Sequence, residues 1–224
     1  YNNLKVVSVS PWLMKRAAQS LILRNKDHYC IYNGVDTNVF CVYDTLKKKN
    51  KYCPNGEKMI FHATAFFSDE ENDLKGGQWI LRLAERMIDK PIKFVVAGPY
   101  DIKGTVPQNV ILLGEVVDQE DLANLYSESD ITLIASRRET FSMVVAESLC
   151  CGTPVVGFEA GAPELISIAD YSRFVSQGDL CGMESFVMQF LNAKFDKVEI
   201  SSAAIEKYSK EKMVADYIDI YKSF

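Results

Sequence analysis

The sequence has few of the residues that build metal centres. Its 224 residues include two histidines and six cysteines, and no cysteines are spaced as Cys-x-x-Cys. These residues complete no zinc pattern, and no Asp-x-Asp pair is present to hold a divalent cation. The adjacent Cys150 and Cys151 stand in an apolar run, which favours small buried thiols in a reducing compartment. We therefore expect no metal site and no disulfide framework.

Long apolar runs and excess positive charge are also missing. No apolar run approaches the ~18 residues of a membrane-spanning helix. The chain carries 25 Lys and Arg against 30 Asp and Glu, a net charge of -5. This balance argues against broad binding to nucleic acid or to anionic membranes, although a local basic pocket can still hold one anionic ligand. The 48% hydrophobic content is enough for a sizeable core.

Apolar strand-like segments alternate with amphipathic helical segments along the whole chain. The pattern predicts strands at 4–10, 28–36, 58–66, 92–98, 109–116, 130–136, 153–158 and 172–175. It predicts helices at 11–23, 77–89, 118–129, from about 141 to 151, 161–169, 182–191 and 202–224. Residues 41–57 are predicted to be a loop or linker, and Asn33-Gly34 a turn with positive φ. This alternation is typical of a Rossmann-like, doubly wound parallel α/β sheet with helices on both faces.

Two loops that follow predicted strands carry candidate binding groups. Lys75-Gly76-Gly77 precedes the helix at 77–89, where free amides and one cation suit a phosphate. Thr140 is predicted to cap the helix that contains Glu147, a glutamate in apolar company. From the pattern alone, Glu147 is either a surface carboxylate or a buried one that binds ligand hydroxyls. Gly98 and Gly114 end other strands, where a small residue allows a ligand to approach.

These residues occur in an order that resembles the C-terminal, nucleotide-sugar-binding domain of GT-B glycosyltransferases, in particular the retaining family 4 enzymes. The segment YNGVDTNVF (32–40) is similar to the junction between the two domains of that family. The segments FVVAGP and VILLGEV match in kind and order. Residues 122–166 resemble the donor-site block, in which Glu139 and Glu147 form the EX7E pair.

The resemblance implies a role for each candidate. Glu139 would face the donor sugar as the catalytic carboxylate, Glu147 would bind the ribose hydroxyls, and Lys75 would balance the diphosphate. Amides around Thr140, Phe141, Ser142 and Met143 would neighbour the diphosphate or sugar, with Gly76, Gly98 and Gly114 completing the binding site. The implied donor is a nucleotide-diphosphate sugar, with UDP or GDP as the expected nucleotide. The implied reaction needs neither metal nor cofactor and retains anomeric configuration.

The sequence departs from the family at two positions. Relatives usually carry Gly-Arg after the strand at 58–66, whereas Thr64 stands roughly where that arginine would be. Either Arg137 or Arg138 supplies the charge instead, or the donor is held more weakly. Ser142 replaces a glycine that commonly follows the Phe. His62, near the end of the same strand, is expected to pack in the core rather than to act as a catalyst.

The resemblance also predicts the domain organisation. Residues 1–36 would be the last strand–helix–strand of an acceptor-binding domain, 37–206 the donor domain and 207–224 a helix that crosses back. We therefore expect the chain to be part of a longer cytoplasmic protein, whose acceptor is a glycan or a lipid-linked glycan. Peripheral association with the inner face of a membrane is compatible with this family. Two alternatives stay open at this stage: a nucleotide-sugar epimerase of similar architecture, and a non-catalytic nucleotide-binding module.

Overall fold

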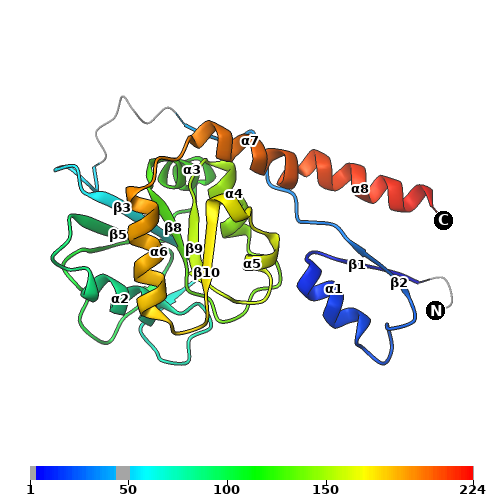
Figure 1. Cartoon of the computed structure of the whole chain (residues 1–224), viewed down its shortest axis with the longest axis horizontal. Helices are drawn as coiled ribbons and strands as arrows, with labels where there is room; N and C mark the ends of the chain where they lie inside the picture. The colour runs from blue at the N-terminus through cyan, green and yellow to red at the C-terminus, as the bar shows by residue number, and fades with distance from the viewer. Residues whose placement is uncertain (1–3, 44–50, 224) are drawn as a thin grey trace.

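The computed structural model describes residues 4–43 and 51–223 and contains a six-stranded, all-parallel sheet. The strand order is β10-β9-β8-β3-β5-β7 (Figure 1). Its strands are β3 (Lys58–Ala63), β5 (Ile92–Ala97), β7 (Val110–Gly114), β8 (Ile131–Ile134), β9 (Val155–Phe158) and β10 (Ser172–Val175). The predicted doubly wound α/β fold is confirmed, because the chain runs outward from β3 in one direction and from β8 in the other.

Helices cover both faces of this sheet, and each face has its own apolar cluster. One cluster joins the sheet to α3 (Gln119–Glu128), α4 (Met143–Cys150) and α7 (Lys197–Tyr208). The other joins it to α2 (Gly77–Arg86) and α6 (Leu180–Asn192). Cys150 and Cys151 lie fully buried in the first cluster, as their apolar context predicts, and all six cysteines are free thiols. The short elements are β4 (Phe67–Ser68), β6 (Tyr100–Asp101), α5 (Pro163–Ile166) and the 3-10 turn η1 (Ala169–Tyr171).

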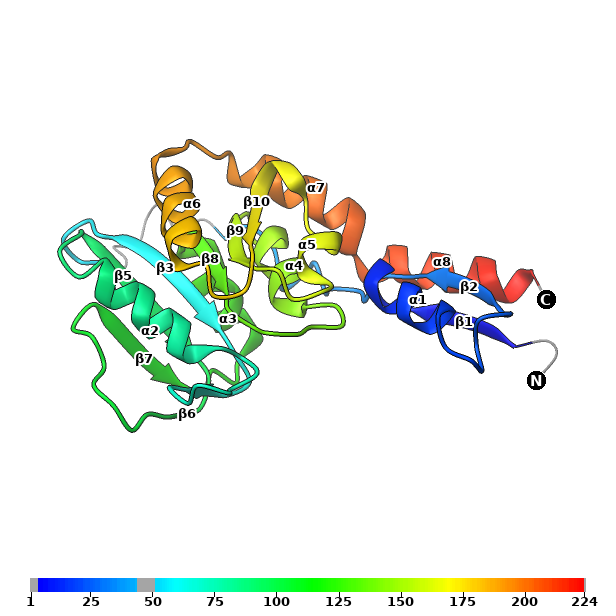
Figure 2. The ribbon, with the colours of Figure 1, turned by 60° about the horizontal axis from the view of Figure 1, so that its bottom comes forward.

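The first part of the chain forms a separate strand–helix–strand unit. Parallel strands β1 (Lys5–Ser8) and β2 (Asp27–Cys30) flank α1 (Pro11–Ala18). As predicted, Ser10 caps α1, its hydroxyl accepting from the Leu13 amide at 3.2 Å, with Pro11 in the first turn. The helix is five residues shorter than the predicted 11–23, because residues 20–25 form turns. This unit lies beside the end of α8 (Lys210–Lys222), where Lys5 Nζ donates to Ser223 (Figures 1 and 2).

Two predictions about the chain's connections need correction. Gly34 lacks the positive φ expected of an Asn-Gly turn; it is a close-packing position, since an added Cβ would lie 2.6 Å from Lys210 Cα. The predicted helix 202–224 is two helices, α7 and α8, which separate at Ser209. They separate where the extended residues around Val35 cross them, because the Val35 amide donates to Tyr208 O and the Lys210 amide to Val35 O. The predicted loop at 41–57 lies partly outside the described residues.

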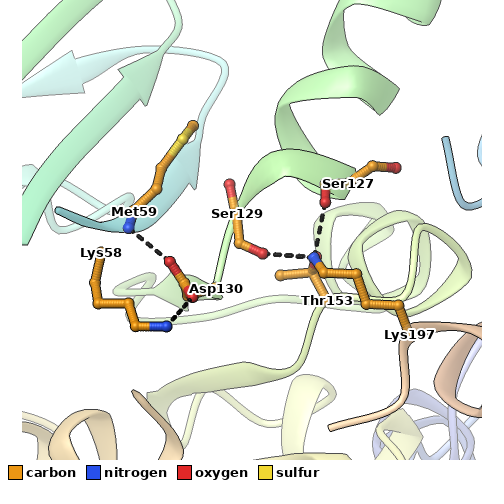
Figure 3. Close-up of polar contacts among 7 residues, drawn as sticks. All are labelled: Lys58, Met59, Ser127, Ser129, Asp130, Thr153 and Lys197. Carbon is orange, nitrogen blue, oxygen red and sulfur yellow. Dashed lines mark hydrogen bonds and ion pairs between the residues drawn. The ribbon is translucent and has the colours of Figure 1, made fainter. Parts of the chain in front are cut away.

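A half-buried lysine ties α7 to the C-terminal end of α3. Lys197, the first residue of α7, directs its ammonium at the carbonyl oxygens of Ser127 and Ser129, both at 2.7 Å (Figure 3). It also lies 3.2 Å from Thr153 Oγ1. Carbonyl groups at a helix C-terminus carry partial negative charge, so a cation is favourable there. Burial lowers the pKa of Lys197 to about 8, so the ammonium is still mostly protonated at neutral pH.

No helix in the described part of the chain combines the length and the apolar content needed to cross a bilayer.

Candidate functional site

A cavity of about 640 Å³ opens at the carboxyl ends of β3 and β8, the two neighbouring strands from which the sheet winds in opposite directions. Ligands of open α/β sheets bind at this kind of position. The lining residues come from the segments after β3, β5, β7 and β8, from helices α3 and α4, and from the junction at Asn33.

Most of the predicted binding residues meet in this cavity. It is lined by Lys75, Gly98, Glu139, Thr140, Phe141, Ser142, Met143 and Glu147. Gly76 and Gly114 are not among its lining residues. Several further lining residues were not singled out as binding residues from the sequence; those with polar side chains are Asn33, Glu115, Tyr126 and Ser136. Tyr126 was expected only to face inward from its helix. Hydrophobic periodicity predicts which face of a helix is buried, but it does not predict which residue of another element that face contacts.

Glu147 lies in the second turn of α4 with its carboxylate at the cavity. The fully buried Tyr126 donates its hydroxyl to Glu147 Oε2 at 3.2 Å. Burial raises the pKa of Glu147 to about 7, and the Tyr126 hydrogen bond only partly opposes that rise. A carboxylate in this setting is stabilised by further hydroxyl donors. The arrangement excludes a fully solvated surface role for Glu147.

Glu139 and Lys75 form an ion pair across the cavity mouth. Lys75 Nζ lies 2.8 Å from Glu139 Oε1, with the two side chains 37% and 19% exposed. The loop that carries Glu139 is fixed at two points, since the Glu139 amide donates to Ala160 O and the Arg137 amide to Leu74 O, each at 2.9 Å. The loops that follow β3 and β8 are thereby joined, and a cation and a carboxylate stand together at one place in the site.

The start of α4 differs from the prediction. The helix begins at Met143, and its N-cap is Ser142 rather than Thr140. Ser142 has φ 82 and ψ 87, a left-handed conformation, and is the only non-glycine residue with positive φ in the described ranges. This turn moves the helix start along the chain, and the Thr140 carbonyl instead accepts from Ser10 Oγ at 2.6 Å. The strand–helix–strand unit therefore contacts the loop that carries Glu139 and Thr140 directly.

The start of α2 also differs. The amides of Lys75 and Gly76 were expected to be free for a phosphate, but both donate to Asp73 Oδ2, at 3.1 and 2.8 Å. Gly76 serves close packing, because a Cβ there would lie 2.2 Å from Ala135 O. These two amides are occupied within the protein, and the Lys75 side chain is what this segment presents to the cavity.

The positions that depart from the family leave the site with little positive charge. Thr64 lines the cavity, but its hydroxyl donates to Phe66 O at 2.8 Å. Neither Arg137 nor Arg138 lines the cavity, and Arg137 Nη2 donates instead to Glu71 O at 2.6 Å. Of the described residues that line it, Lys75 is the only lysine or arginine. The suggestion that an arginine at 137 or 138 replaces the missing charge is wrong for this conformation.

His62 packs in the core, as predicted, and also borders the cavity. Its side chain is 3% exposed, and its Nδ1 lies 3.0 Å from Leu133 O. Burial lowers the pKa of His62 to about 4, so the ring is neutral at physiological pH and Nδ1 carries the proton toward the carbonyl.

Within residues 4–43 and 51–223, no group of three or more His, Cys, Asp or Glu residues is arranged to hold a metal ion.

Comparison with known proteins gives a consistent set of matches. The family described as glycosyl transferases group 1 matches residues 62–192. The chain is 27% identical to the N-acetyl-alpha-D-glucosaminyl L-malate synthase of Bacillus anthracis, a match over 96% of this chain and 58% of that protein. It is 26% identical to an uncharacterized 41.2 kDa protein in the cps region of Klebsiella pneumoniae, over 98% of this chain and 61% of that one. The chain thus spans about 60% of the length of these relatives.

Solved structures share the fold. The sucrose-phosphate synthase of Thermosynechococcus elongatus superposes with a TM-score of 0.79 at 16% identity, covering 98% of this chain and 58% of that one. Anabaena Alr3699/HepE in complex with UDP and glucose superposes with a TM-score of 0.76 at 15% identity, covering 98% and 63%. At these identities the superpositions establish the architecture alone.

Proposed function

The chain belongs to the glycosyl transferases group 1 family, with the GT-B architecture, and we propose that it is the donor-binding part of a retaining glycosyltransferase. One observation carries the proposal: Lys75, Glu139 and Glu147 line a single cavity at the switch point of the sheet. A cation and two carboxylates in one cavity match the diphosphate and the two sets of hydroxyls of a nucleotide-diphosphate sugar. The solved Anabaena relative holds UDP and glucose, which supports this ligand class.

In the proposed complex, Glu147 accepts the ribose hydroxyls beside Tyr126, and Lys75 neutralises the diphosphate. Binding exchanges the Lys75–Glu139 ion pair for contacts with the donor, so that Glu139 accepts hydroxyls of the transferred sugar. Hydrogen bonds to a charged group contribute about 1.5–3 kcal/mol each, so both carboxylates are strong anchors. Gly98 allows close packing at the cavity lining, because a Cβ there would lie 2.2 Å from Thr64 O.

The chemistry that follows is transfer of the sugar with retention of configuration. The departing diphosphate takes the acceptor proton on the face of the sugar from which it leaves, and Lys75 stabilises the negative charge that develops on it. We propose that no divalent metal takes part, and that the fixed ammonium supplies the positive charge.

The acceptor class in this proposal is a polysaccharide or lipid-linked glycan of a cytoplasmic pathway, in line with the relative from a cps region. Other relatives carry names with small polar acceptors, such as the D-inositol 3-phosphate glycosyltransferase of Mycobacterium sp.. An acceptor screen therefore includes both classes. Peripheral membrane association of a longer protein is part of the same proposal.

The deciding experiment is a thermal-shift screen with UDP-, GDP- and ADP-sugars, followed by calorimetry. A ligand at 100 times its Kd stabilises the folded state by about 2.7 kcal/mol, a rise in Tm of roughly 5–10 °C for a chain of this length. The expected result is a shift with one nucleotide class that is unchanged by EDTA. Absence of any shift, or a shift that requires Mg²⁺ or Mn²⁺, would refute the proposal.

A second candidate function is a nucleotide-sugar-binding module without transferase activity. The observation that favours it is Thr64 in place of an arginine, with Lys75 the only basic lining residue among those described. Binding of a nucleotide sugar by the longer protein, without transfer to any acceptor, would select this candidate. The epimerase alternative has no specific support from the arrangement of the cavity.

A further inference from the structure

His62 has one ring nitrogen that the described part of the chain leaves without a partner. Nδ1 donates to the Leu133 carbonyl at 3.0 Å, whereas Nε2 is buried and has no hydrogen-bond partner among the described residues. An unpaired buried polar atom is costly, and native proteins rarely keep one without a reason. His62 lines the cavity, but it is only 3% exposed and Nε2 is buried, so a ligand group reaches this nitrogen only after a small shift of the side chains around it.

The chemistry of this nitrogen is fixed by its neighbours. The Leu133 carbonyl can only accept, so Nδ1 must carry the proton, and the neutral ring then has a lone pair at Nε2. Nε2 can therefore accept a hydrogen bond but cannot donate one. A diphosphate at neutral pH offers no donor, which excludes it as the partner. A hydroxyl or an amide N–H is the kind of group that fits.

The position of His62 selects which part of the ligand it meets. Successive residues of a strand point to opposite faces. Phe61 packs against Tyr126, with ring centroids 5.0 Å apart, on the face that carries Glu147. His62 packs against Phe67 at 5.8 Å on the other face, where Lys75 leads into α2. His62 thus lies on the same side of the sheet as Lys75, and Glu147, which the proposed function assigns to the nucleoside, lies on the other side.

We propose that His62 is a specificity-determining residue, whose Nε2 accepts a hydrogen bond from a hydroxyl or N-acyl N–H of the transferred sugar. The inference rests on the proposed function, since it requires a nucleotide sugar in this cavity. Under this proposal His62, a neutral hydrogen-bond acceptor outside the EX7E pair, discriminates between donor sugars. A sugar that lacks the matching donor group leaves the nitrogen unpaired and binds more weakly.

Two variants separate the two ring nitrogens. His62→Asn places an amide N–H near Nδ1, so the Leu133 contact is kept, but it removes the acceptor at Nε2. His62→Gln reaches the position of Nε2 with an amide oxygen and keeps an acceptor there. Thermal unfolding of both variants in the absence of ligand establishes that they fold.

Calorimetry then compares the nucleotide sugar with the matching nucleoside diphosphate. For His62→Asn we expect a 3- to 10-fold weaker Kd for the nucleotide sugar and an unchanged Kd for the diphosphate. His62→Gln should stay within about 2-fold of the wild type for both ligands. A series of nucleotide sugars, each lacking one hydroxyl, identifies the hydroxyl that donates to Nε2. Loss of that hydroxyl should weaken binding to the wild type but should not weaken binding to His62→Asn any further.

The contrary results are distinct from a failure of the proposed function. If no nucleotide sugar binds the wild type, the function itself is wrong and His62 has no such ligand. If nucleotide sugars bind but His62→Asn leaves their Kd unchanged, the partner of Nε2 is not on the sugar. An equal loss for the sugar and the diphosphate would likewise overturn the inference, since it would mean a general change of the cavity.

Discussion

Ser142 holds a backbone conformation that glycine adopts at much lower cost. Its φ of 82 lies in the left-handed region, and its side chain makes no capping hydrogen bond to α4. Such strain at a non-glycine residue costs on the order of 1–3 kcal/mol. The glycine that commonly stands at this position in the family therefore has a backbone explanation.

The first prediction tests this strain. Ser142→Gly should raise the free energy of unfolding by about 1 kcal/mol, because relief of the strain exceeds the added freedom of the unfolded chain. Ser167→Gly is the matched control: Ser167 has φ -62, so this change should lower stability by up to about 1 kcal/mol. Urea unfolding measures both, and a loss of stability in Ser142→Gly would contradict the strain.

The buried charge of Glu147 should lower the stability of the ligand-free protein, although the same charge is proposed to bind the ribose hydroxyls. Its pKa is about 7 in the folded state against 4.5 for the ordinary group. Below pH 4.5 both states hold the proton, and between 4.5 and 7 the unfolded state releases it first, so the free energy of unfolding falls as pH rises. Above pH 7 the full cost is present, about 3 kcal/mol.

The second prediction follows from this pH dependence. Glu147→Gln keeps an acceptor for Tyr126 and removes the buried charge, so it should be more stable than the wild type by about 2–3 kcal/mol at pH 8. The difference should nearly vanish near pH 4.5. Unfolding in urea at both pH values measures the effect, with the exposed Glu206→Gln as the control that should change little. Equal stability of Glu147→Gln and wild type at pH 8 would show that Glu147 is well solvated.

The third prediction concerns the division of roles between the two glutamates. Glu147→Gln should weaken a plain nucleoside diphosphate tenfold or more, because hydrogen bonds to a charged group are lost. Glu139→Gln should leave that ligand nearly unchanged and weaken the nucleotide sugar. Calorimetry with both ligands separates the roles. If Glu139→Gln impairs the plain diphosphate as much as Glu147→Gln does, the division fails for this protein.

At the scale of elements, Lys197 shows how α7 is held against the sheet. Its ammonium satisfies the carbonyl groups of Ser127 and Ser129 at the end of α3 (Figure 3). The neighbouring pair Lys58–Asp130 secures the start of β3, with Asp130 also accepting from the Met59 amide at 2.8 Å. Two independent polar contacts thus fix the loop between α3 and β8.

The fourth prediction removes the first of these contacts. Lys197→Met keeps the apolar stem but leaves two carbonyl groups without their cation, so it should lower the free energy of unfolding by about 2–4 kcal/mol. Lys194→Met, three residues earlier at an exposed position, is the control and should change stability by less than about 0.5 kcal/mol. A loss in Lys197→Met no larger than in the control would mean that the contact contributes little.

The elements show what the sequence can and cannot predict. Strand and helix order followed from hydrophobic periodicity, and Gly152 ends α4 with φ 77, as its place before Pro154 indicates. The start of α4 was missed because a serine gives no sign that it will adopt a glycine-like turn. The break at Ser209 was missed because it depends on a segment about 175 residues away in the chain.

The candidate site was predictable to a similar extent. The two glutamates and Lys75 were identified because they follow buried strands in a recognisable order, and the structure brings them to one cavity. The pairing of Lys75 with Glu139 and the use of two α2 amides by Asp73 could not be deduced, since they depend on how separate loops meet. The sequence likewise could not show which ring nitrogen of His62 is left free, because this depends on the Leu133 carbonyl of the neighbouring strand β8.

At the scale of the whole molecule, the chain contains the cavity at the switch point of the sheet and, beside α8, a separate strand–helix–strand unit. The relatives extend well beyond the matched part, because the chain covers 58% and 61% of their lengths. In the proposed organisation the acceptor groups belong to that remaining part.

The fifth prediction is that the 224-residue chain binds a nucleoside diphosphate but does not transfer sugar by itself. Calorimetry measures the binding, and a radiolabelled donor incubated with candidate acceptors measures the transfer. Fusion of the chain to an acceptor-binding domain should allow transfer without changing the Kd for the diphosphate by more than a few-fold. Robust acceptor-dependent transfer by the isolated chain would contradict the proposed division between donor and acceptor parts.

The ion pair between Lys75 and Glu139 has a consequence for how the protein responds to ionic strength. In the proposed complex a diphosphate displaces Glu139 from Lys75, so the protein carries its own competitor for the ligand. At physiological concentration, dissolved salt screens the interaction between partly exposed charges with a Debye length of about 8 Å. It therefore weakens the attraction of Lys75 for Glu139 as well as its attraction for the incoming diphosphate. The two effects oppose each other in the measured affinity. Donor binding should therefore be nearly constant over a range of salt concentrations at which an unpaired surface lysine would lose most of its attraction for a phosphate.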